Sequence, residues 1–419
     1  MNKTTRWRSQ RLEHLGSAIF AEVAGWKAEA RAAGLDVIDL GIGSPDLPPA
    51  EPLRQELSRQ ALREDRYGYP SSRGDAAFLS QASAWLAHRF GIAVDPVTEL
   101  LALMGSQDGL AHLALAVTNP GDKALLPDPG YPIYGAGAAL AGVEPMFYPL
   151  RESSAFLPDL DAIPEEQWRA AAYMIVNIPG NPVSAVADLP FFERLLDKAR
   201  KYDVLVVHDL AYSEMAFDGW QPPSILQLPG AAEIAVEFHS LSKSFNLAGC
   251  RIGFLAGNRE AVGALADLKA NIDYGVFNAV QQTAIAALRA DMERGSRPSV
   301  GALYQRRRDR FVAALREEGW EVEMPKATMF LWARIPSMDG GSSWTSRSIS
   351  REMVRQAGVA VIPGDAFGKE GEGFVRIAIV EQEERLVEAA RRIGSFLREH
   401  GLVGKAAEQE ESDANGVGF

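Results

Sequence analysis

The repeating order of short apolar runs and longer amphipathic stretches between residues 98 and 257 constrains the fold of this chain more than any other feature. The stretches between the runs, such as LPFFERLLDKARKY (189–202), have the periodicity of helices. Strands that are apolar along their whole length are typical of parallel sheets with helices on both faces. The pattern therefore predicts an α/β fold, with a three-layer α/β/α domain around a mostly parallel sheet. The apolar runs are TELLALM (98–104), DKALLP (122–127), AAYMIVN (171–177), YDVLVVHD (202–209), AVEFHSL (235–241) and CRIGFLAG (250–257).

The pattern changes after about residue 290, which predicts a second, smaller α+β domain. There RRRDRFVAALREEG (306–319) has the form of a long charged helix, and MFLWARI (329–335) and FVRIAIV (374–380) have the form of strands. A chain of 419 residues is also more compatible with two domains than with one. We expect an N-terminal segment that packs on the small domain, 1–45; a large ligand-binding domain, 46–290; a small C-terminal domain, 291–402; and an acidic, disordered tail, 403–419.

The composition excludes several classes of protein. The chain is 47% hydrophobic and 23% charged, as in ordinary globular proteins, and its formal net charge of −12 argues against nucleic acid or an anionic membrane as a partner. No apolar window predicts a signal peptide or a membrane-spanning helix. The single cysteine, Cys250, rules out an intramolecular disulfide and fits a reducing cytoplasm. The six histidines are scattered without an HExxH motif, so we expect no metal site.

Small and polar residues collect just after the predicted strands. In open α/β sheets ligands bind beyond the carboxyl ends of the strands, so these residues are the candidates for a site. They are Gly105, Ser106, Gln107, Asn177, Asn181, Asp209, Tyr212, Ser240, Ser242 and Lys243.

Gly105, Ser106 and Gln107 form a candidate anion-binding loop between a predicted strand and a predicted helix. The free amides of a helix N-terminus bind phosphate, and glycine and serine let the anion approach closely. An ordinary strand–helix turn explains the same residues. A dinucleotide-binding loop is a less favoured alternative, because its nearest match, GAGAAL (135–140), has Leu140 where the third glycine is needed.

Asp209 directly follows the apolar run VLVVH, so its carboxylate emerges at the end of a buried strand. A buried carboxylate needs a cationic partner, and a protonated pyridine nitrogen would be one. Tyr212 and Asn181 could then reach the phenolic oxygen of the same ring. Each residue also has a purely structural explanation: Asp209 as a helix cap, Tyr212 as a packing residue, and Asn181 with Pro182 as a turn.

Lys243 stands in a loop of small hydroxyl residues, HSLSKSF, with Ser240 before it and Arg251 after it. Such a lysine is most often a surface charge. Pyridoxal 5′-phosphate, however, needs a lysine that condenses with its aldehyde, a carboxylate for its ring nitrogen, and donors for its phosphate and phenolic oxygen. Tyr131 in PDPGYPIY could stack on the pyridine ring. Arg376 in the small domain could clamp a substrate carboxylate, the alternative being a surface arginine on a strand.

Three motifs carry a resemblance to a known family: NPGDKALLPDPGYPIY, VVHDLAYSEMAFDG and VEFHSLSKSFNLAGCRIGF. Through them the chain resembles the fold-type I, pyridoxal-phosphate-dependent class I/II aminotransferases over residues 15–400, and the motifs are most similar to the LL-diaminopimelate aminotransferase branch. The resemblance implies that the large domain, 46–290, binds pyridoxal phosphate. It implies these roles: Lys243 as the covalent and catalytic lysine, Asp209 on the ring nitrogen, Tyr212 and Asn181 on the phenolic oxygen, Tyr131 as the stacking ring, and Gly105, Ser106, Gln107, Ser240 and Arg251 around the phosphate.

The resemblance also implies how substrate and subunits meet. Gly43, Asn181 and Arg376 would bind the substrate, with Arg376 on its α-carboxylate. Tyr69, in YGYPSSRG, would reach the phosphate in the other subunit of a homodimer with shared active sites.

The chain departs from the family pattern at a few positions. It has PGNPVSA where the family usually has NNPTG, so Val183 and Ser184 replace the usual neighbours of Asn181. Leu79 stands where an arginine is usual, and Cys250 where a tryptophan is common. These departures leave the identity of the substrate open and indicate a paralogue of the biosynthetic enzyme.

The sequence thus predicts a cytoplasmic aminotransferase that moves an amino group between an amino acid and a 2-oxo acid in a ping-pong cycle. Two alternatives remain at this level: a pyridoxal-phosphate-dependent lyase on the same fold, catalysing β-elimination or decarboxylation, and a cofactor-binding regulatory module without catalysis. A lyase would turn over without a 2-oxo-acid co-substrate, and a regulator would be expected to carry a basic helix–turn–helix extension.

Overall fold

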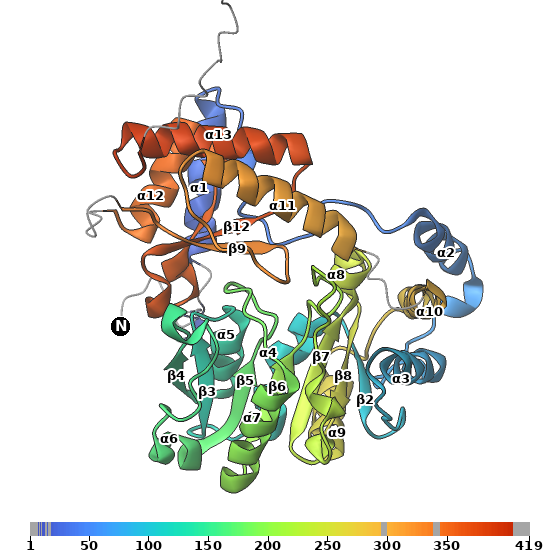
Figure 1. Cartoon of the computed structure of the whole chain (residues 1–419). Helices are drawn as coiled ribbons and strands as arrows, with labels where there is room; N and C mark the ends of the chain where they lie inside the picture. The colour runs from blue at the N-terminus through green and yellow to red at the C-terminus, as the bar shows by residue number, and fades with distance from the viewer. Residues whose placement is uncertain are drawn as a thin grey trace, which may run out of the picture.

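A seven-stranded sheet forms the centre of the protein (Figure 1), with the strand order β2-β8-β7-β6-β5-β3-β4. The computed structural model describes residues 18–294, 300–337 and 344–404 and, before them, residues 7, 9, 11, 12 and 15. Only β8 runs against its neighbours, so the prediction of a mostly parallel sheet is confirmed. The strands are β2 (Leu100–Leu103), β3 (Lys123–Asp128), β4 (Glu144–Pro149), β5 (Ala171–Val176), β6 (Leu205–Asp209), β7 (Ala235–Ser240) and β8 (Gly253–Gly257).

Helices cover both faces of this sheet and make the three layers. One face packs against α4 (Ser106–Val117), α5 (Ile133–Ala141) and α9 (Arg259–Ile272). The other face packs against α3 (Ala76–Phe90), α7 (Leu189–Tyr202) and α10 (Asn278–Arg294). Outside these lie α2 (Glu51–Ala61), against α10, and the short α6 (Glu165–Ala170).

Helix α7 shows how the sequence produces these layers. It begins after Asp188, whose side chain accepts a hydrogen bond from the amide of Phe191 at 3.1 Å, and proline at the second helical position fits a first turn. Apolar residues recur at helical spacing along it, and five of them are buried against β5 and β6: Phe191, Phe192, Leu195, Leu196 and Ala199.

A second group of elements lies above the carboxyl ends of the parallel strands (Figure 1). Helices α11 (Gly301–Glu317), α12 (Ser346–Glu352) and α13 (Glu383–Glu399) pack around a small antiparallel sheet. Its strands are β11 (Ile362–Pro363), β12 (Phe374–Ala378) and β9 (Phe330–Arg334), in that order.

The N-terminal elements join this second group. Strand β1 (Ile38–Asp39) pairs in parallel with β10 (Val359–Ala360), and α1 (Ala18–Ala32) packs beside it. The predicted boundaries between the domains stay a prediction. At the other end, the sequence-based division places Val403 in the tail, whereas its side chain is buried in the core, and residues 405–419 lie outside the described part of the chain.

The two groups are tied together by arginines of α11. The predicted charged helix is not solvated all round, because Arg307 and Arg308 are both buried. Arg307 donates to both carboxylate oxygens of Asp46 at 2.7 Å. Arg308 donates to both oxygens of Asp218 at 2.7 and 2.8 Å. Such bidentate pairs fix α11 above the large sheet.

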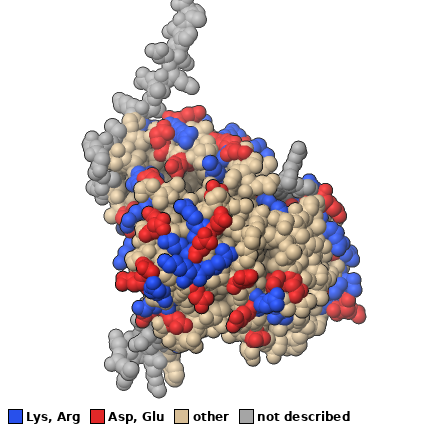
Figure 2. All heavy atoms as spheres, turned by 60° about the horizontal axis from the view of Figure 1, so that its bottom comes forward, with Lys and Arg blue, Asp and Glu red and all other residues tan. Residues whose placement is uncertain are grey.

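The outer surface carries charges of both signs. Figure 2 shows acidic and basic side chains interspersed on the face at the bottom of Figure 1. Among the described residues, no helix combines the length and the apolar character needed to cross a membrane.

Candidate active site

A cavity of about 920 Å³ lies at the carboxyl ends of the strands, between the large sheet and the elements above it. The structure brings most of the predicted site residues to its wall: Gly43, Ser106, Gln107, Tyr131, Asn181, Asp209, Tyr212, Ser240, Lys243, Arg251 and Arg376. Two predicted residues are not part of the wall, Gly105 and Tyr69.

Lys243 reaches the cavity from α8 (Leu241–Ser244), a single turn that follows β7 directly. Ser240 starts this turn, since its hydroxyl accepts a hydrogen bond from the amide of Ser242 at 3.3 Å. The amino group of Lys243 donates to the carbonyl of Gly43 at 2.6 Å. Burial, together with the nearby Arg376 and Arg251, lowers the pKa of Lys243 to about 8. At neutral pH a useful fraction of this amine is therefore an unprotonated nucleophile.

Asp209, the last residue of β6, is buried at the floor of the cavity. Its Oδ2 accepts a hydrogen bond from the hydroxyl of Tyr134 at 2.8 Å, whereas its Oδ1 is buried without a hydrogen-bond partner among the described residues. Burial raises the pKa of this carboxyl, and the Tyr134 hydroxyl and the neighbouring His208 oppose that change. Oδ1 is thus an acceptor that lacks a donor.

Gly105 and Arg251 form one unit at the start of α4. Gly105 has a φ of 77°, and a Cβ at this position would lie 2.5 Å from Nη2 of Arg251. Glycine therefore lets the guanidinium lie directly against the loop. Beside it are the free amides at the helix N-terminus and Gln107, whose side-chain oxygen accepts from the hydroxyl of Tyr131 at 3.0 Å. Cation and amides together suit an anion such as phosphate.

Arg376 reaches the cavity from the middle of β12 and is almost fully buried. It donates to the side-chain oxygen of Asn181 at 2.9 Å and to the carbonyl of Gly41 at 2.8 Å. Its guanidinium lies 4.4 Å from the ring centre of Phe330 and 4.8 Å from that of Phe367. Burial lowers its pKa to about 10, which still leaves it cationic at neutral pH. A surface arginine is therefore excluded.

The residues present fit pyridoxal phosphate. Oδ1 of Asp209 is placed to accept from a protonated ring nitrogen, and its burial gives a reason to bind a cation there. Lys243 supplies an amine that no carboxylate holds in the described structure, and the Gly105–Arg251 unit suits the phosphate. Tyr212 is buried beside them, and burial raises the pKa of its phenol. It therefore stays a hydrogen-bond donor.

Sequence reasoning missed several residues of the site. One is Tyr134, which lies behind the cavity wall and acts through its hydrogen bond to Asp209. Phe20, Val23 and Lys27 of α1 also line the cavity. Nothing local in the sequence indicates this, because only the tertiary packing of α1 brings them there.

The residues that depart from the family pattern are not part of the cavity wall. Leu79 and Val183 are buried in apolar clusters, and the hydroxyl of Ser184 contacts that of Thr328 at 2.7 Å. None of these, nor Cys250, is among the described residues that line the cavity.

Tyr69 lies on the outer surface, where 90% of it is exposed. Its ring is 5.5 Å from that of Tyr274, and the ring of Tyr67 is 5.6 Å from that of Phe277. Tyr67, Tyr69 and Phe277 line a separate surface hollow of about 320 Å³. Within one chain, Tyr69 therefore does not contribute to the cavity that holds Lys243.

The chain matches known proteins over most of its length. The profile of the family described as "Aminotransferase class I and II" matches residues 35–393. The LL-diaminopimelate aminotransferase of Moorella thermoacetica is 43% identical over 389 residues, which cover 93% of this chain and 98% of that protein. The enzyme of the same name from Desulforudis audaxviator is 44% identical over 390 residues, 93% of this chain and 97% of that protein.

Solved structures share the whole architecture. Substrate-bound BacF from Bacillus subtilis superposes with a TM-score of 0.86 at 34% identity, covering 93% of this chain and 97% of that one. A probable N-succinyldiaminopimelate aminotransferase from Thermus thermophilus superposes with a TM-score of 0.83 at 40% identity, covering 90% and 99%. With this fold and this cavity, the chain belongs to the class I and II aminotransferases, which depend on pyridoxal phosphate.

Proposed function

We propose that the cavity holds pyridoxal phosphate as follows. Lys243 binds the aldehyde carbon, Asp209 accepts from the ring nitrogen, and Tyr212 and Asn181 donate to the phenolic oxygen. Tyr131 stacks on the ring, and Ser106, Gln107, Ser240 and Arg251 hold the phosphate against the Gly105 loop. The observation that carries this assignment is the meeting, in one cavity, of an amine with a pKa of about 8 and a buried carboxylate oxygen that lacks a donor.

Each of these residues would then have its own role in the reaction. When bound, the cofactor supplies an aldehyde for amines and a protonated ring that accepts the electrons of a broken Cα–H bond. The amino group of Lys243 would carry the proton to and from Cα of the substrate. Asp209 keeps the ring nitrogen protonated. Arg376 fixes the α-carboxylate, and with it the orientation of the Cα–H bond.

The substrates we propose are an amino acid and a 2-oxo acid, with LL-diaminopimelate as the first donor to test. The similar proteins named for this substrate support the choice. The cavity also has a charged group beyond Arg376: Lys27 lines its wall and contacts Asp39 at 2.7 Å. A donor with a second ionic group at its far end could pair with these charges.

A half-reaction screen tests this function. Each amino acid is mixed with the cofactor-loaded enzyme without an oxo acid, and loss of the visible absorbance of the bound cofactor is followed. We expect LL-diaminopimelate to react faster than amino acids with short apolar side chains, and multiple turnovers to require a 2-oxo acid. Sustained product formation without any oxo acid would contradict a transaminase and indicate a lyase.

We also propose a cytoplasmic homodimer in which Tyr69 completes the cavity of the other subunit. The exposure of Tyr69, Tyr67 and Tyr274, and the hollow that Tyr67 and Tyr69 line with Phe277, support a contact surface here. A sedimentation measurement of the full chain tests the assembly, and a fully active monomer would contradict it.

A further inference from the structure

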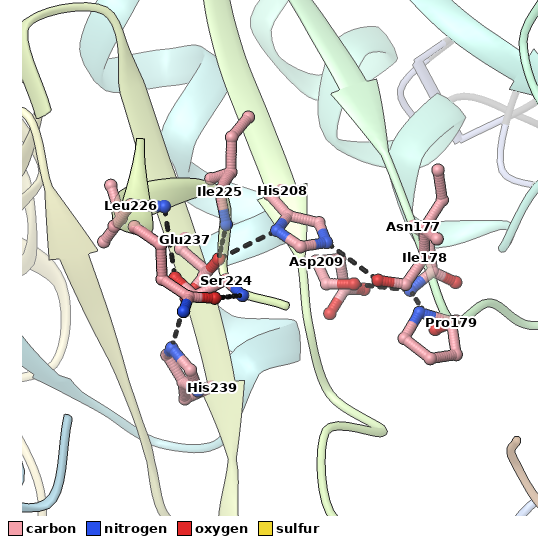
Figure 3. Close-up of polar contacts among 11 residues, drawn as sticks. Asn177, Ile178, Pro179, His208, Asp209, Ser224, Ile225, Leu226, Glu237 and His239 are labelled. Carbon is pink, nitrogen blue, oxygen red and sulfur yellow. Dashed lines mark hydrogen bonds and ion pairs between the residues drawn. The ribbon is translucent and has the colours of Figure 1, made fainter. Parts of the chain in front are cut away.

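A second cluster of titratable side chains lies directly behind Asp209, on the other face of the sheet. Successive residues of a strand point to opposite faces, so His208 of β6 points away from the cavity, toward α7, where the ring of Phe192 lies 4.9 Å away. His208, Ser224, Glu237 and His239 are all fully or almost fully buried (Figure 3). None of them is used in the site described above.

The carboxylate of Glu237 is the centre of this cluster, and it accepts four hydrogen bonds. Oε1 accepts from the hydroxyl of Ser224 at 2.7 Å and from Nε2 of His239 at 2.8 Å. Oε2 accepts from the amide of Ile225 at 3.0 Å and from Nδ1 of His208 at 2.8 Å. Burial alone would raise the pKa of Glu237, but the two histidines hold it well below its usual range. Glu237 is therefore ionised.

Counting protons then fixes the charge of His208. Its Nδ1 faces the Glu237 carboxylate, and its Nε2 lies 2.8 Å from the carbonyl of Ile178, which can only accept. Both ring nitrogens must therefore donate, and a histidine with two N–H groups is an imidazolium. His239 differs, because its Nδ1 is buried without a hydrogen-bond partner among the described residues. A second proton there would be unpaired, so His239 is neutral.

His208 is connected to the active site in two ways. First, it is the chain neighbour of Asp209, whose carboxylate is buried. The other titratable groups near that carboxylate are Tyr134, Tyr131, Tyr212, Lys243 and His239. Second, through Ile178, His208 also holds the loop after β5. In that loop Asn177 donates to the backbone carbonyl of Asp209 at 2.7 Å and accepts from the amide of Asn181 at 2.8 Å.

We propose that His208, held as an imidazolium by Glu237, is a positioning residue that keeps Asp209 ionised and fixes the loop that carries Asn181. A buried carboxylate is stable only near positive charge, and His208 supplies that charge before any ligand does. The inference rests on the proposed role of Asp209 as the acceptor from the cofactor's ring nitrogen.

The charge of His208 can be measured in the wild-type protein loaded with cofactor. With ¹⁵N-labelled histidine, one of the six imidazoles should carry a proton on both ring nitrogens in the folded protein at neutral pH, as the two acceptors facing His208 require. His208→Gln should remove that signal. If all six histidines are neutral at this pH, the proposal is wrong.

The effect on Asp209 is tested by ligand preference. The dissociation constant of pyridoxal phosphate is compared with that of its 1-deaza analogue, in which carbon replaces the ring nitrogen and no donor faces Asp209. His208→Gln keeps a donor for Ile178 but loses the charge. At a pH below the pKa of Asp209, a one-unit rise in that pKa lowers the ionised fraction of Asp209 about tenfold, so it would weaken pyridoxal phosphate by about tenfold and would leave the analogue unchanged or tighter. Equal weakening of both ligands would overturn the proposal, because it shows a structural role only.

Two further variants separate the possible failures. His239→Gln is the matched control: its amide can keep the bond to Glu237, no charge is lost, and the preference should stay as in wild type. Asp209→Asn should abolish the preference. If wild type and Asp209→Asn show the same preference, the role of Asp209 fails. If Asp209→Asn loses the preference but His208→Gln retains it as in wild type, Asp209 stands and the inference about His208 fails.

Discussion

The amino group of Lys243 shares its cavity with two guanidinium groups, those of Arg251 and Arg376. Burial raises the free energy of protonating the lysine, and each of the two positive charges adds to the effect. The folded protein thus carries a proton on Lys243 only at a cost, below a pKa of about 8, whereas the unfolded chain carries it up to about 10.5. A reactive amine is obtained by destabilising the cofactor-free protein.

That cost predicts that Lys243→Met stabilises the cofactor-free protein at pH 7. A shift from 10.5 to about 8 corresponds to about 3 kcal/mol, and the lost hydrogen bond to Gly43 and partial exposure reduce the expected gain to about 1–2 kcal/mol. Because the folded-state pKa is the lower one, the penalty is full below pH 8 and disappears as pH rises to 10.5. Denaturant unfolding at pH 7 and at pH 10.5 measures the difference.

Lys198→Met is the control for this prediction. Lys198 forms a surface ion pair with Asp161 at 2.8 Å, so its loss should change the free energy of unfolding by less than about 1 kcal/mol at either pH. A Lys243 variant that is less stable than wild type at pH 7 would show that the desolvation of Lys243 is small.

Arg376 is predicted to act on every substrate alike. Arg376→Leu should reduce kcat/KM for the amino donor and for the oxo acid by similar factors, equivalent to about 2–5 kcal/mol for a buried charged contact. Arg376→Lys should recover part of the loss, since it keeps the charge but not the paired geometry. Steady-state kinetics with two donors and two acceptors measure this. A loss confined to one substrate would mean that Arg376 contacts a side chain.

At the scale of elements, the loop between β2 and α4 is shaped by one glycine. Gly105 has both a left-handed backbone and a neighbour, the guanidinium of Arg251, in the space of a side chain. Gly91, which ends α3, has a similar φ of 70°, but a Cβ there would meet nothing within 4 Å. Alanine substitutions at Gly105 and Gly91 therefore distinguish the effect of backbone strain, common to both, from the displacement of Arg251, expected only at Gly105.

We therefore predict different outcomes for the two alanine variants. Both should lose about 1 kcal/mol of stability from the strained backbone. Only Gly105→Ala should also raise the dissociation constant of pyridoxal phosphate, by about tenfold or more, because it moves the cation from the phosphate site. Fluorescence titration with the cofactor checks this. Equal cofactor affinity in the two variants would place the phosphate elsewhere.

The strands of the large sheet show how much of the fold could be predicted from the sequence. Every apolar run predicted as a strand of the large sheet overlaps an observed strand, since continuous burial leaves a continuous apolar signature. Strand β4, EPMFYP, was missed because it is an edge strand, largely exposed and carrying prolines. The antiparallel direction of β8 could not be predicted, because its composition does not differ from that of a parallel strand.

The candidate site could be predicted where a residue follows a strand directly. Asp209 ends β6 and Lys243 lies in the single turn after β7, and topology brings strand ends together. The wall contributed by α1 could not be predicted, because Phe20 and Lys27 reach the cavity only through long-range packing. The burial of Arg307 could not be predicted either, because its helix is rich in charged residues and its partner, Asp46, is far away in the chain.

At the scale of the whole molecule, the cavity is assembled from distant parts of the chain. Arg376 comes from the C-terminal strands, Gly41 and Gly43 from the N-terminal segment, and Lys243 from the turn that follows β7 of the large sheet. Tyr69 is left outside this assembly on an exposed aromatic surface. If that surface pairs two chains about a two-fold axis, each lends its Tyr69 to the other.

Hybrid dimers test this sharing. A Lys243→Ala chain and a Tyr69→Phe chain, carrying different affinity tags, are refolded together and the hybrid is purified. In one of its cavities Lys243 comes from the second chain and an intact Tyr69 from the first, while the other cavity carries both defects. The hybrid should therefore bind one equivalent of pyridoxal phosphate as tightly as wild type, which neither parent homodimer can do.

The reverse combination gives the opposite expectation and rules out a general effect of mixing. Wild-type chains paired with Lys243→Ala/Tyr69→Phe chains have a complete cavity only if Tyr69 acts within its own chain. With sharing, the wild-type cavity receives phenylalanine from its partner, and the other cavity lacks the lysine, so no tight site should remain. A tight site in this hybrid, together with none in the first, would show that Tyr69 serves its own chain. Because both hybrids carry the same two substitutions in total, only the arrangement of the chains distinguishes the results.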